Sequence, residues 1–314
     1  MLNRRNIRIK VMQGIFGMQE SQSDDLPANE KLLFLSFNNI YKLYILLLLF
    51  LVELKKRAER EVESAKKKNF PTEEERNPSY KFVNNRIFKF FQDNLFLQEY
   101  AKNYKLDKWK RDPEFVVLVL QKIKSGKIYR EYMQNNISSF KDDKEFVLEL
   151  YKNHIAPEEK LHDSFESDES HWADDIATAN TFVMKTISDI KELDTVHKEF
   201  FNLFKDEMDR DFAKELFRKV VLNDKELTEM LQGRTPNWEY DRISRIDRLI
   251  LKMGIAEIIY FPSIPPNVTI NEYVEIAKEY STQKSNIFIN GVLDKVLKDL
   301  KKDKKLNKNI RGNM

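Results

Sequence analysis

The sequence predicts an all-α protein, and three features support this prediction. Only 7 glycines and 9 prolines occur in 314 residues, which is too few for the many turns of a β-sandwich or a β-barrel. Charged residues make up 33% of the chain, a proportion that suits long helices with solvated faces. Near the N-terminus Ile7, Val11 and Ile15 recur every four residues and so share one helix face.

The composition excludes several kinds of chemistry. The chain has no cysteine, so it forms no disulfide, Cys-ligated zinc site or iron–sulfur cluster and uses no cysteine nucleophile. It contains no Gly-rich phosphate loop, nucleophile elbow or HExxH motif. His162 and His171 lie in an acidic stretch that is interpreted as a solvated turn rather than a metal site. We therefore expect a cytoplasmic, non-catalytic protein without metal or cofactor.

The first helix is expected from Asn3 to Glu20, followed by a turn-rich break at Ser21–Glu30. A long helix is expected from about Glu30, ending in a charged rod near Lys66–Lys68. Within it, Ile40–Val52 is strongly apolar, but these thirteen residues fall short of the roughly 20 that cross a membrane. The segment is interpreted as a buried core helix, with no membrane partner.

The region from Ser79 to Phe140 alternates aromatic and basic residues. Its aromatic residues include Tyr80, Phe82, Phe88, Phe90, Phe91, Phe96, Tyr100, Tyr104 and Trp109. Such a pattern can stack on single-stranded bases, but in helices the aromatic residues more often form the core. The core interpretation is favoured, and the stacking interpretation stays open. Pro113 is expected at the first turn of a new helix. Near the C-terminus, Thr269-Ile270-Asn271-Glu272 has the spacing of a capping box, which predicts that a helix restarts there after Pro262, Pro265 and Pro266.

The chain contains an internal repeat with a constant offset of 66 residues. The identical pairs are Asp143 and Asp209, Phe146 and Phe212, Glu149 and Glu215, Leu150 and Leu216, Leu161 and Leu227, Trp172 and Trp238, and Asp175 and Asp241. Self-similarity at a fixed period indicates a repeated supersecondary unit. We expect a duplicated helical module with the two tryptophans in equivalent places.

Both ends of the chain resemble one known family. The Arg-rich start, Arg4-Arg5-Asn6-Ile7-Arg8, and the strings INEYVEIAKEY and FINGVLDKV near the C-terminus resemble the NusB family of transcription antitermination factors. The resemblance covers residues 1–20 and 209–300. It implies a helical bundle of two subdomains, here enlarged by an inserted helical region. The expected division is 1–20, an insertion at 21–142, a divergent first module at 143–208 and a family-like unit at 209–314.

The resemblance implies RNA contact by the basic residues Arg4, Arg5, Arg8 and Lys10. Positive charge at a helix N-terminus opposes the macrodipole, so a basic cluster at this place favours a negatively charged partner. Arg also carries forked donors that suit phosphates and base edges. The alternative is a solvated helix end. Because Ile7 and its neighbours on the apolar face provide the packing, the arginines are expected to be removable at little cost in stability.

A second RNA contact is expected at Lys284, Ser285 and Phe288. Ser281 or Thr282 is expected to cap the last helix, whose N-terminus could then receive a phosphate. The family usually has an acidic residue where Lys284 stands, and the change favours RNA. Core packing is the alternative for Phe288.

The family also binds the ribosomal protein NusE, and the matching surface would include Phe16, Asp241 and Asp247. Core packing of Phe16 and helix capping by the two aspartates are the alternatives. The function that the resemblance implies is binding of boxA-type RNA with NusE in the RNA polymerase antitermination complex, in support of ribosomal RNA operons. Two other functions stay open: an accessory domain for an RNA methyltransferase, or a protein scaffold that does not bind RNA.

Overall fold

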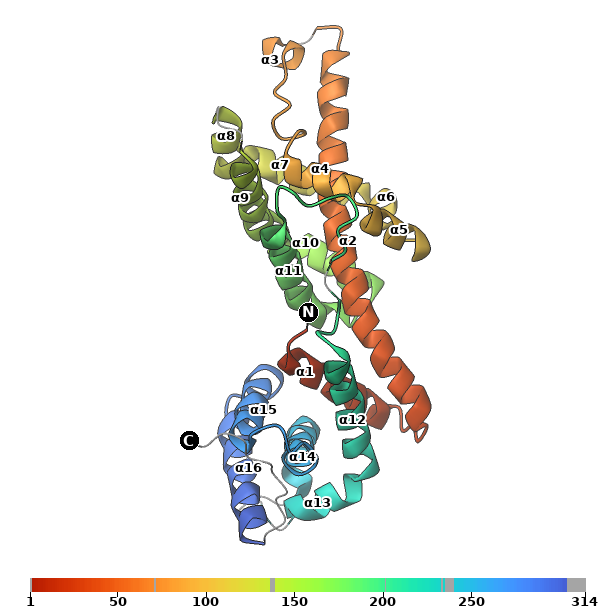
Figure 1. Ribbon diagram of the computed structural model, residues 1–314, viewed down its shortest axis with the longest axis vertical. Helices are drawn as coiled ribbons and strands as arrows, with labels where there is room; N and C mark the ends of the chain where they lie inside the picture. The colour runs from red at the N-terminus through yellow and green to blue at the C-terminus, as the bar shows by residue number, and fades with distance from the viewer. Residues whose placement is uncertain are drawn as a thin grey trace. The chain divides into compact units, whose positions relative to one another are not determined.

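The computed structural model describes residues 2–70, 72–135, 139–200, 202–232, 234 and 240–303, with the side chains of residues 74 and 241 excepted. Within these residues every regular element is a helix and no strand occurs (Figure 1). The all-α prediction is confirmed. The chain divides into two compact units: unit 1 comprises Met1–Phe37 and Leu203–Met314, and unit 2 comprises Asn38–Asn202.

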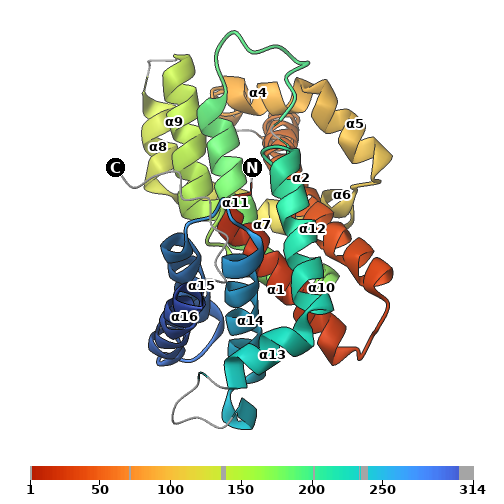
Figure 2. The same ribbon diagram turned by 60° about the horizontal axis from the view of Figure 1, so that its bottom comes forward.

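Unit 1 contains the two ends of the chain. Its helices are α1 (Arg4–Glu20), the start of α2 (Leu26–Lys66), α12 (Glu207–Leu222), α13 (Asp224–Gln232), α14 (Arg245–Tyr260), α15 (Pro266–Tyr280) and α16 (Ser285–Lys302), with a 3₁₀ turn at Tyr240–Arg242. Helix α1 packs on α12, α14 and α15, and α14, α15 and α16 pack on one another (Figure 2). The two family-like ends therefore share one core.

Helix α1 begins and buries its residues as its sequence predicts. Asn3 is the N-cap: its side chain accepts from the Asn6 amide at 2.8 Å, and the Asn6 side chain accepts from the Asn3 amide. Two of the four orphan amides of the helix start are involved in such capping. Ile7 and Val11 are fully buried, and Ile15 is 1% exposed. The predicted apolar face of α1 is confirmed.

Unit 2 holds the remaining helices. They are α2 from Asn38 onward, α3 (Glu73–Arg76), α4 (Arg86–Asp93), α5 (Leu95–Asn103), α6 (Lys108–Arg111), α7 (Pro113–Ser125), α8 (Lys127–Gln134), α9 (Phe140–Leu150), a π-helical turn (Tyr151–Ile155), α10 (Glu159–Asp168) and α11 (Trp172–Asp189). Pro113 occupies the first turn of α7, as predicted.

Helix α2 begins at Leu26, four residues before the predicted start. The Asp25 side chain accepts from the Ala28 amide at 2.9 Å, an N-terminal cap that the sequence analysis overlooked. Among the described helices α2 is the one whose length and composition would allow it to cross a membrane. Its most apolar segment is enclosed by the protein, with Leu43 and Leu48 at 0% exposure. The prediction of a buried core helix at Ile40–Val52 is confirmed.

Four of the nine aromatic residues named for the basic-aromatic region belong to the core of unit 2. Phe82, Phe88, Phe91 and Trp109 are between 0% and 4% exposed, which confirms the core interpretation for these residues. Tyr104 differs, because 60% of it is exposed.

The two repeated modules have the same first two helices. Phe146 in α9 and Phe212 in α12 are both 5% exposed, and Leu161 in α10 and Leu227 in α13 are 1% and 0% exposed. The third helices differ, because α11 begins at Trp172 and α14 begins seven positions later in the repeat. The helical part of the prediction is confirmed. The tryptophan of the second copy lies outside the described residues.

Each module also anchors a preceding helix through its first aspartate. In unit 2 Asp143 is 2% exposed, accepts from the Tyr132 hydroxyl at 2.7 Å and pairs with Arg86 at 3.2 Å. In unit 1 Asp209 pairs with Arg4 at 3.0 Å. Arg86 and Arg4 are the first residues of α4 and α1. The similarity of the two modules therefore extends to how an earlier helix is held.

We predict that Tyr132→Phe destabilises the protein by about 1.5–3 kcal/mol, the usual contribution of a hydrogen bond to a charged group. The ring, which stacks on Phe146 at 3.8 Å, is retained, so the loss reports the hydroxyl alone. The control is Tyr129→Phe, whose hydroxyl has no hydrogen-bond partner among the described residues. Urea unfolding measures both. Equal stability of the two variants would show that Asp143 does not need the hydroxyl.

Candidate nucleic-acid interface

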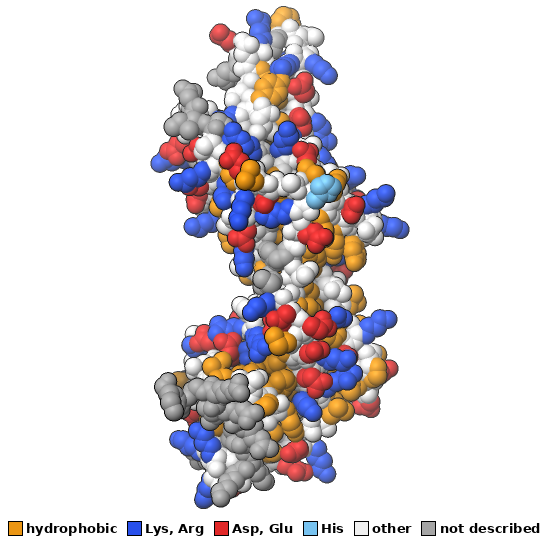
Figure 3. Space-filling model, viewed as in Figure 1, with side chains coloured by type: hydrophobic (Ala, Val, Ile, Leu, Met, Phe, Trp, Pro, Cys, Tyr) orange, Lys and Arg blue, Asp and Glu red, His pale blue; other side chains and the backbone are white. Residues whose placement is uncertain are grey.

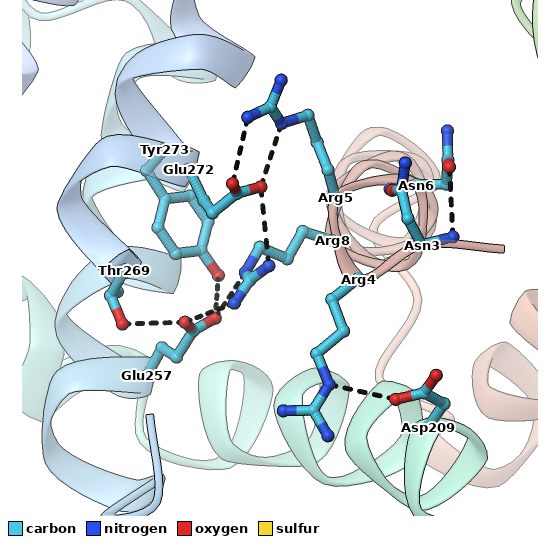
Figure 4. Close-up of polar contacts among 10 residues, drawn as sticks. All are labelled: Asn3, Arg4, Arg5, Asn6, Arg8, Asp209, Glu257, Thr269, Glu272 and Tyr273. Carbon is cyan, nitrogen blue, oxygen red and sulfur yellow. Dashed lines mark hydrogen bonds and ion pairs between the residues drawn. The ribbon is translucent and has the colours of Figure 1, made fainter. Parts of the chain in front are cut away.

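The centre of unit 1 is an ion pair between Arg8 of α1 and Glu257 of α14. Arg8 donates from Nε at 2.8 Å and from Nη2 at 2.7 Å to the two oxygens of the carboxylate (Figure 4). The Arg8 side chain is 2% exposed and that of Glu257 is 0% exposed. A bidentate geometry of this kind is the strongest form of the Arg–carboxylate interaction.

The buried carboxylate has further donors. Thr269 of α15 donates its hydroxyl at 2.8 Å to one oxygen of Glu257, and Tyr273 donates at 3.2 Å to the other. Burial lowers the pKa of Arg8, but its hydrogen bond to Glu257 and the nearby acidic charges raise it more, so its pKa lies above the ordinary value. Arg8 is therefore a charged structural residue, and it joins α1 to α14 and α15.

Arg4 and Arg5 start the same helix and remain half-exposed. Arg5 forms a bidentate pair with Glu272, at 2.9 and 3.0 Å, and Arg4 donates from Nε to Asp209 at 3.0 Å (Figure 4). Their side chains are 40% and 43% exposed. The two amino groups of Arg4 make no hydrogen bond to the described residues. They are available for a bidentate contact with a phosphate.

The exposed arginines border a groove of about 500 Å³, which we call the arginine groove. Its lining comprises Asn3, Arg4, Arg5, Arg8, Ser263, Ile264, Pro265, Val268 and Glu272. The apolar residues come from the segment that leads into α15 and from the first turn of that helix, where Pro266 is the first helical residue. Forked donors beside apolar surface suit a sugar–phosphate chain with unpaired bases.

The surface shows no large area of a single charge in the view of Figure 3. Lys and Arg side chains alternate there with Asp and Glu, in agreement with the net charge of +3. The arginine groove therefore attracts an anion through specific donors rather than through a broad field.

Two of the predicted RNA contacts are corrected by burial. Arg8 is 2% exposed and Lys10 is 4% exposed, so both side chains lie inside unit 1 rather than on its surface. The expectation that all the arginines can be removed at little cost is revised for Arg8, because its loss would leave the buried Glu257 carboxylate without its partner. One signal in the sequence could have marked Glu257 as buried, although not its partner: it is a single carboxylate within the apolar run of α14.

The turn between α15 and α16 is built from hydroxyl groups. Ser285 donates to Asp247 of α14 at 2.9 Å, and its oxygen lies 3.0 Å from Ser281 and 2.8 Å from Thr282. Neither Ser281 nor Thr282 caps α16: the N-cap is Lys284, which makes no side-chain capping bond. The capping prediction is wrong because both hydroxyls are directed to Ser285.

The other predicted contacts have different exposures. Lys284 is exposed, Ser285 is buried, and Phe288 and Phe16 are half-buried. Asp247 is 7% exposed, and its second carboxylate oxygen has no hydrogen-bond partner among the described residues. Ser285 and Asp247, predicted for different partners, therefore belong to one buried contact.

Asp241 lies in the 3₁₀ turn Tyr240–Arg242, and its side chain is outside the described residues. Its contact with a protein partner therefore stays a prediction.

The predicted restart of a helix at Thr269 is also corrected. The sequence suggested a capping box from Thr269 to Glu272, but α15 begins at Pro266, because proline is well tolerated at the first helical position. Both residues then lie inside the helix and contact the arginines and Glu257 instead. Glu272, Glu257 and Asp209 are site residues that the sequence analysis missed.

Matches of this chain to known proteins point to one family. A sequence model of the NusB family matches residues 177–298. The transcription antitermination protein NusB of Salinibacter ruber is 44% identical over 110 residues, which are 35% of this chain and 69% of that protein. The protein of the same name from Methylacidiphilum infernorum is 43% identical over 30% of this chain and 66% of its own length. That of Chloroherpeton thalassium is 38% identical over 33% and 49%.

Among solved structures, a crystal form of T. maritima NusB is 27% identical and matches 45% of this chain and 84% of its own length, with a TM-score of 0.30. The chain thus spans between about half and 69% of the length of the curated relatives it matches.

We predict that Arg8→Ala destabilises the protein by about 3–5 kcal/mol, because it leaves an uncompensated charge in the interior. Arg4→Ala is the matched control on the same helix face, and its half-exposed ion pair should contribute no more than about 1 kcal/mol. Urea unfolding at neutral pH measures both variants. Similar losses for Arg8 and Arg4 would contradict the structural role of Arg8.

We also predict that the Arg5–Glu272 pair stabilises the protein at neutral pH and ceases to do so in acid. The hydrogen bond from Arg5 holds the pKa of Glu272 below its ordinary value. The stability it contributes is therefore present above the unfolded pKa, about 4.3, and is lost as the pH falls through the folded pKa.

Melting temperatures measured from neutral to acidic pH test this prediction. The melting temperature of Glu272→Gln should fall less on acidification than that of the wild type. Glu279→Gln, at an exposed glutamate of the same helix, is the control and should behave as the wild type. If the melting temperature of Glu272→Gln fell on acidification as much as that of the wild type, the Arg5–Glu272 pair would not contribute to stability.

Proposed function

The chain belongs to the NusB family, and on that premise we propose that it is a non-catalytic transcription antitermination factor. The curated relatives carry this function in their names. In this proposal the chain binds boxA-type RNA together with ribosomal protein NusE in the cytoplasm. It then joins the RNA polymerase antitermination complex and supports transcription of ribosomal RNA operons.

The arginine groove is the observation that carries this proposal. Arg4 and Arg5 keep more than a third of their side-chain surface exposed, and both amino groups of Arg4 are available to a phosphate. Apolar Ile264 and Val268 line the same groove and can pack against a base or ribose. Phosphate contacts supply most of the affinity for RNA and make it fall with salt, whereas unpaired bases supply sequence preference.

Lys284 adds a cation at the start of α16, where it is exposed. Phe288, one turn later and half-buried, offers part of its ring. Ser285 serves in positioning, because its bond to Asp247 fixes the first turn of α16 against α14. The proposed RNA surface therefore comprises Arg4, Arg5, Lys284 and Phe288.

For NusE the proposal retains Phe16, which is half-buried on α1. Asp247 acts through its contact with Ser285, because a residue that is 7% exposed offers little surface to a partner. Asp241 is kept as a third candidate from the family resemblance.

We predict that the double variant Arg4→Ala/Arg5→Ala weakens binding to a boxA-like RNA, and that Lys284→Ala acts in the same direction. Each lost phosphate contact should lower the slope of log affinity against log salt by about 0.7 for a single strand. Controls are Arg210→Ala and Lys298→Ala, at exposed residues of α12 and α16. The measurement is fluorescence anisotropy across a salt series, with thermal melts of each variant.

The outcomes separate the alternatives. Unchanged affinity and slope with an intact fold would contradict the proposed RNA surface. Binding to NusE without any binding to RNA would indicate a protein scaffold. Binding to an RNA methyltransferase in place of both would indicate an accessory domain.

A further inference from the structure

Unit 2 exposes an aromatic ring in a position suited to stacking. The rings of Tyr100 and Tyr104 stack with centroids 4.3 Å apart and an interplanar angle of 23°. Tyr100 in turn contacts Tyr41 edge-on at 5.4 Å. Tyr104 ends this series and is 60% exposed. A large aromatic ring held in place on one side and open on the other is what base stacking requires.

The chain directly after Tyr104 is fixed by the end of α5. Leu106 donates its amide to the Ala101 carbonyl at 2.8 Å, and Lys105 donates to Lys102 at 3.3 Å. This is the Schellman arrangement, whose left-handed position is usually glycine. Here it is Lys105, with φ of 51°. A side chain at this position strains the backbone in a way that glycine avoids, so Lys105 is a candidate for a functional cation.

Two hollows of unit 2 meet at this turn. The larger, about 600 Å³, is bordered by α2, α4, α5 and α6 and has apolar residues in its lining, among them Val52 and Leu97. The smaller, about 260 Å³, is lined by Tyr104 and Lys42. Lys105 lines both. These helices lie together in the views of Figures 1 and 2.

Three lysines around the turn have no acidic partner within the part of the chain that the structure describes. Lys102, Lys105 and Lys110 are exposed and have no carboxylate within 4 Å among the described residues. By contrast, Lys108 on the same segment is buried and paired with Asp112 and Asp168.

The acidic residues of the larger hollow are mostly neutralised. Glu53 pairs with Lys56 at 2.7 Å, and Asp107 pairs with Arg111 at 3.1 Å. Asp93 remains without a cation partner among the described residues. Unpaired positive charge therefore exceeds unpaired negative charge, by three lysines to one aspartate.

We propose that this turn of unit 2 is a second nucleic-acid site, which binds single-stranded RNA. One base stacks on the open face of Tyr104, and the phosphates on either side contact Lys102, Lys105 and Lys110. Stacking on aromatic residues with backbone contacts to cations is the general mode of sequence-tolerant single-strand binding. The site goes beyond the proposed function of unit 1 and does not depend on it.

An acidic protein segment could also use the three lysines. The geometry favours RNA, because an acidic segment has no need of the exposed Tyr104 ring, whereas a base stacks on it. The two occupants differ in one measurable way: RNA binding depends on the ring, and binding of an acidic peptide depends on the lysines alone.

The test uses the full chain and a fluorescein-labelled oligouridine of about 12 nucleotides, within the usual size of a single-strand site. Tyr104→Ala should weaken binding about 5- to 150-fold, since stacking contributes about 1–3 kcal/mol per base. Tyr104→Phe, which keeps the ring, should bind as the wild type. Both substitutions are at an exposed residue, so the fold should be retained.

The cations are tested with Lys102→Ala/Lys105→Gly/Lys110→Ala. Glycine at position 105 removes the charge and the left-handed strain together, so weaker binding cannot come from a less stable turn. The salt slope should fall by about 2, at about 0.7 per phosphate contact. The control is Lys152→Ala/Lys160→Ala, at exposed lysines that line neither hollow.

Three results would overturn the proposal. The wild type could fail to bind oligouridine. Tyr104→Ala and the triple lysine variant could both bind it with unchanged affinity and salt slope. Alternatively, a labelled polyglutamate peptide could bind in a way that needs the lysines but not Tyr104, which would indicate a protein partner. Oligouridine carries no boxA element, so these results leave the proposal for unit 1 to its own test on boxA-like RNA.

Discussion

Unit 1 depends on the ion pair between Arg8 and Glu257, whose residues are 249 positions apart in the chain. Removing two charges from water costs several kcal/mol per ion, and only excellent geometry with additional hydrogen bonds offsets that cost. Here the cost is offset by the bidentate contact, by the hydroxyls of Thr269 and Tyr273, and by the nearby Glu272. Helix α1 therefore has one place to pack. All of unit 2 lies between the two residues in sequence. The insertion is compatible with the pair because α1 and α14 still pack on each other in unit 1.

The same pair divides one basic helix start into two functions. Arg4 and Arg8 are four residues apart and thus neighbours on α1, yet their side chains are 43% and 2% exposed. Arg8 is used entirely for packing, and this holds the half-exposed Arg4 and Arg5 at the border of the arginine groove. A surface that is held rigidly before binding loses less side-chain entropy when a ligand arrives.

Periodicity and composition were sufficient to predict the all-α class and several individual helices. The apolar spacing of α1, the short apolar run of α2 and the 66-residue repeat are local or self-similar patterns, and the structure contains all three as helices. The pairing of Arg8 with Glu257 was not predictable in the same way, because it joins distant helices and a single sequence carries no signal for which charge meets which. The start of α15 was missed for a different reason: two local signals competed, and Pro266 prevailed over the Thr269 capping pattern. Tyr104 was indistinguishable from the buried aromatic residues around it until its exposure was known.

The most direct test of this account is a double-mutant cycle on Arg8 and Glu257, with Arg8→Met, Glu257→Leu and the double variant unfolded in urea. If the pair fixes α1 on α14 and α15, the two single variants should each leave a buried charge alone, and the double variant should recover part of the loss. The account predicts a coupling free energy of about 3 kcal/mol. Additive losses with no coupling would show that packing alone positions α1, and that Arg8 does not order the arginine groove.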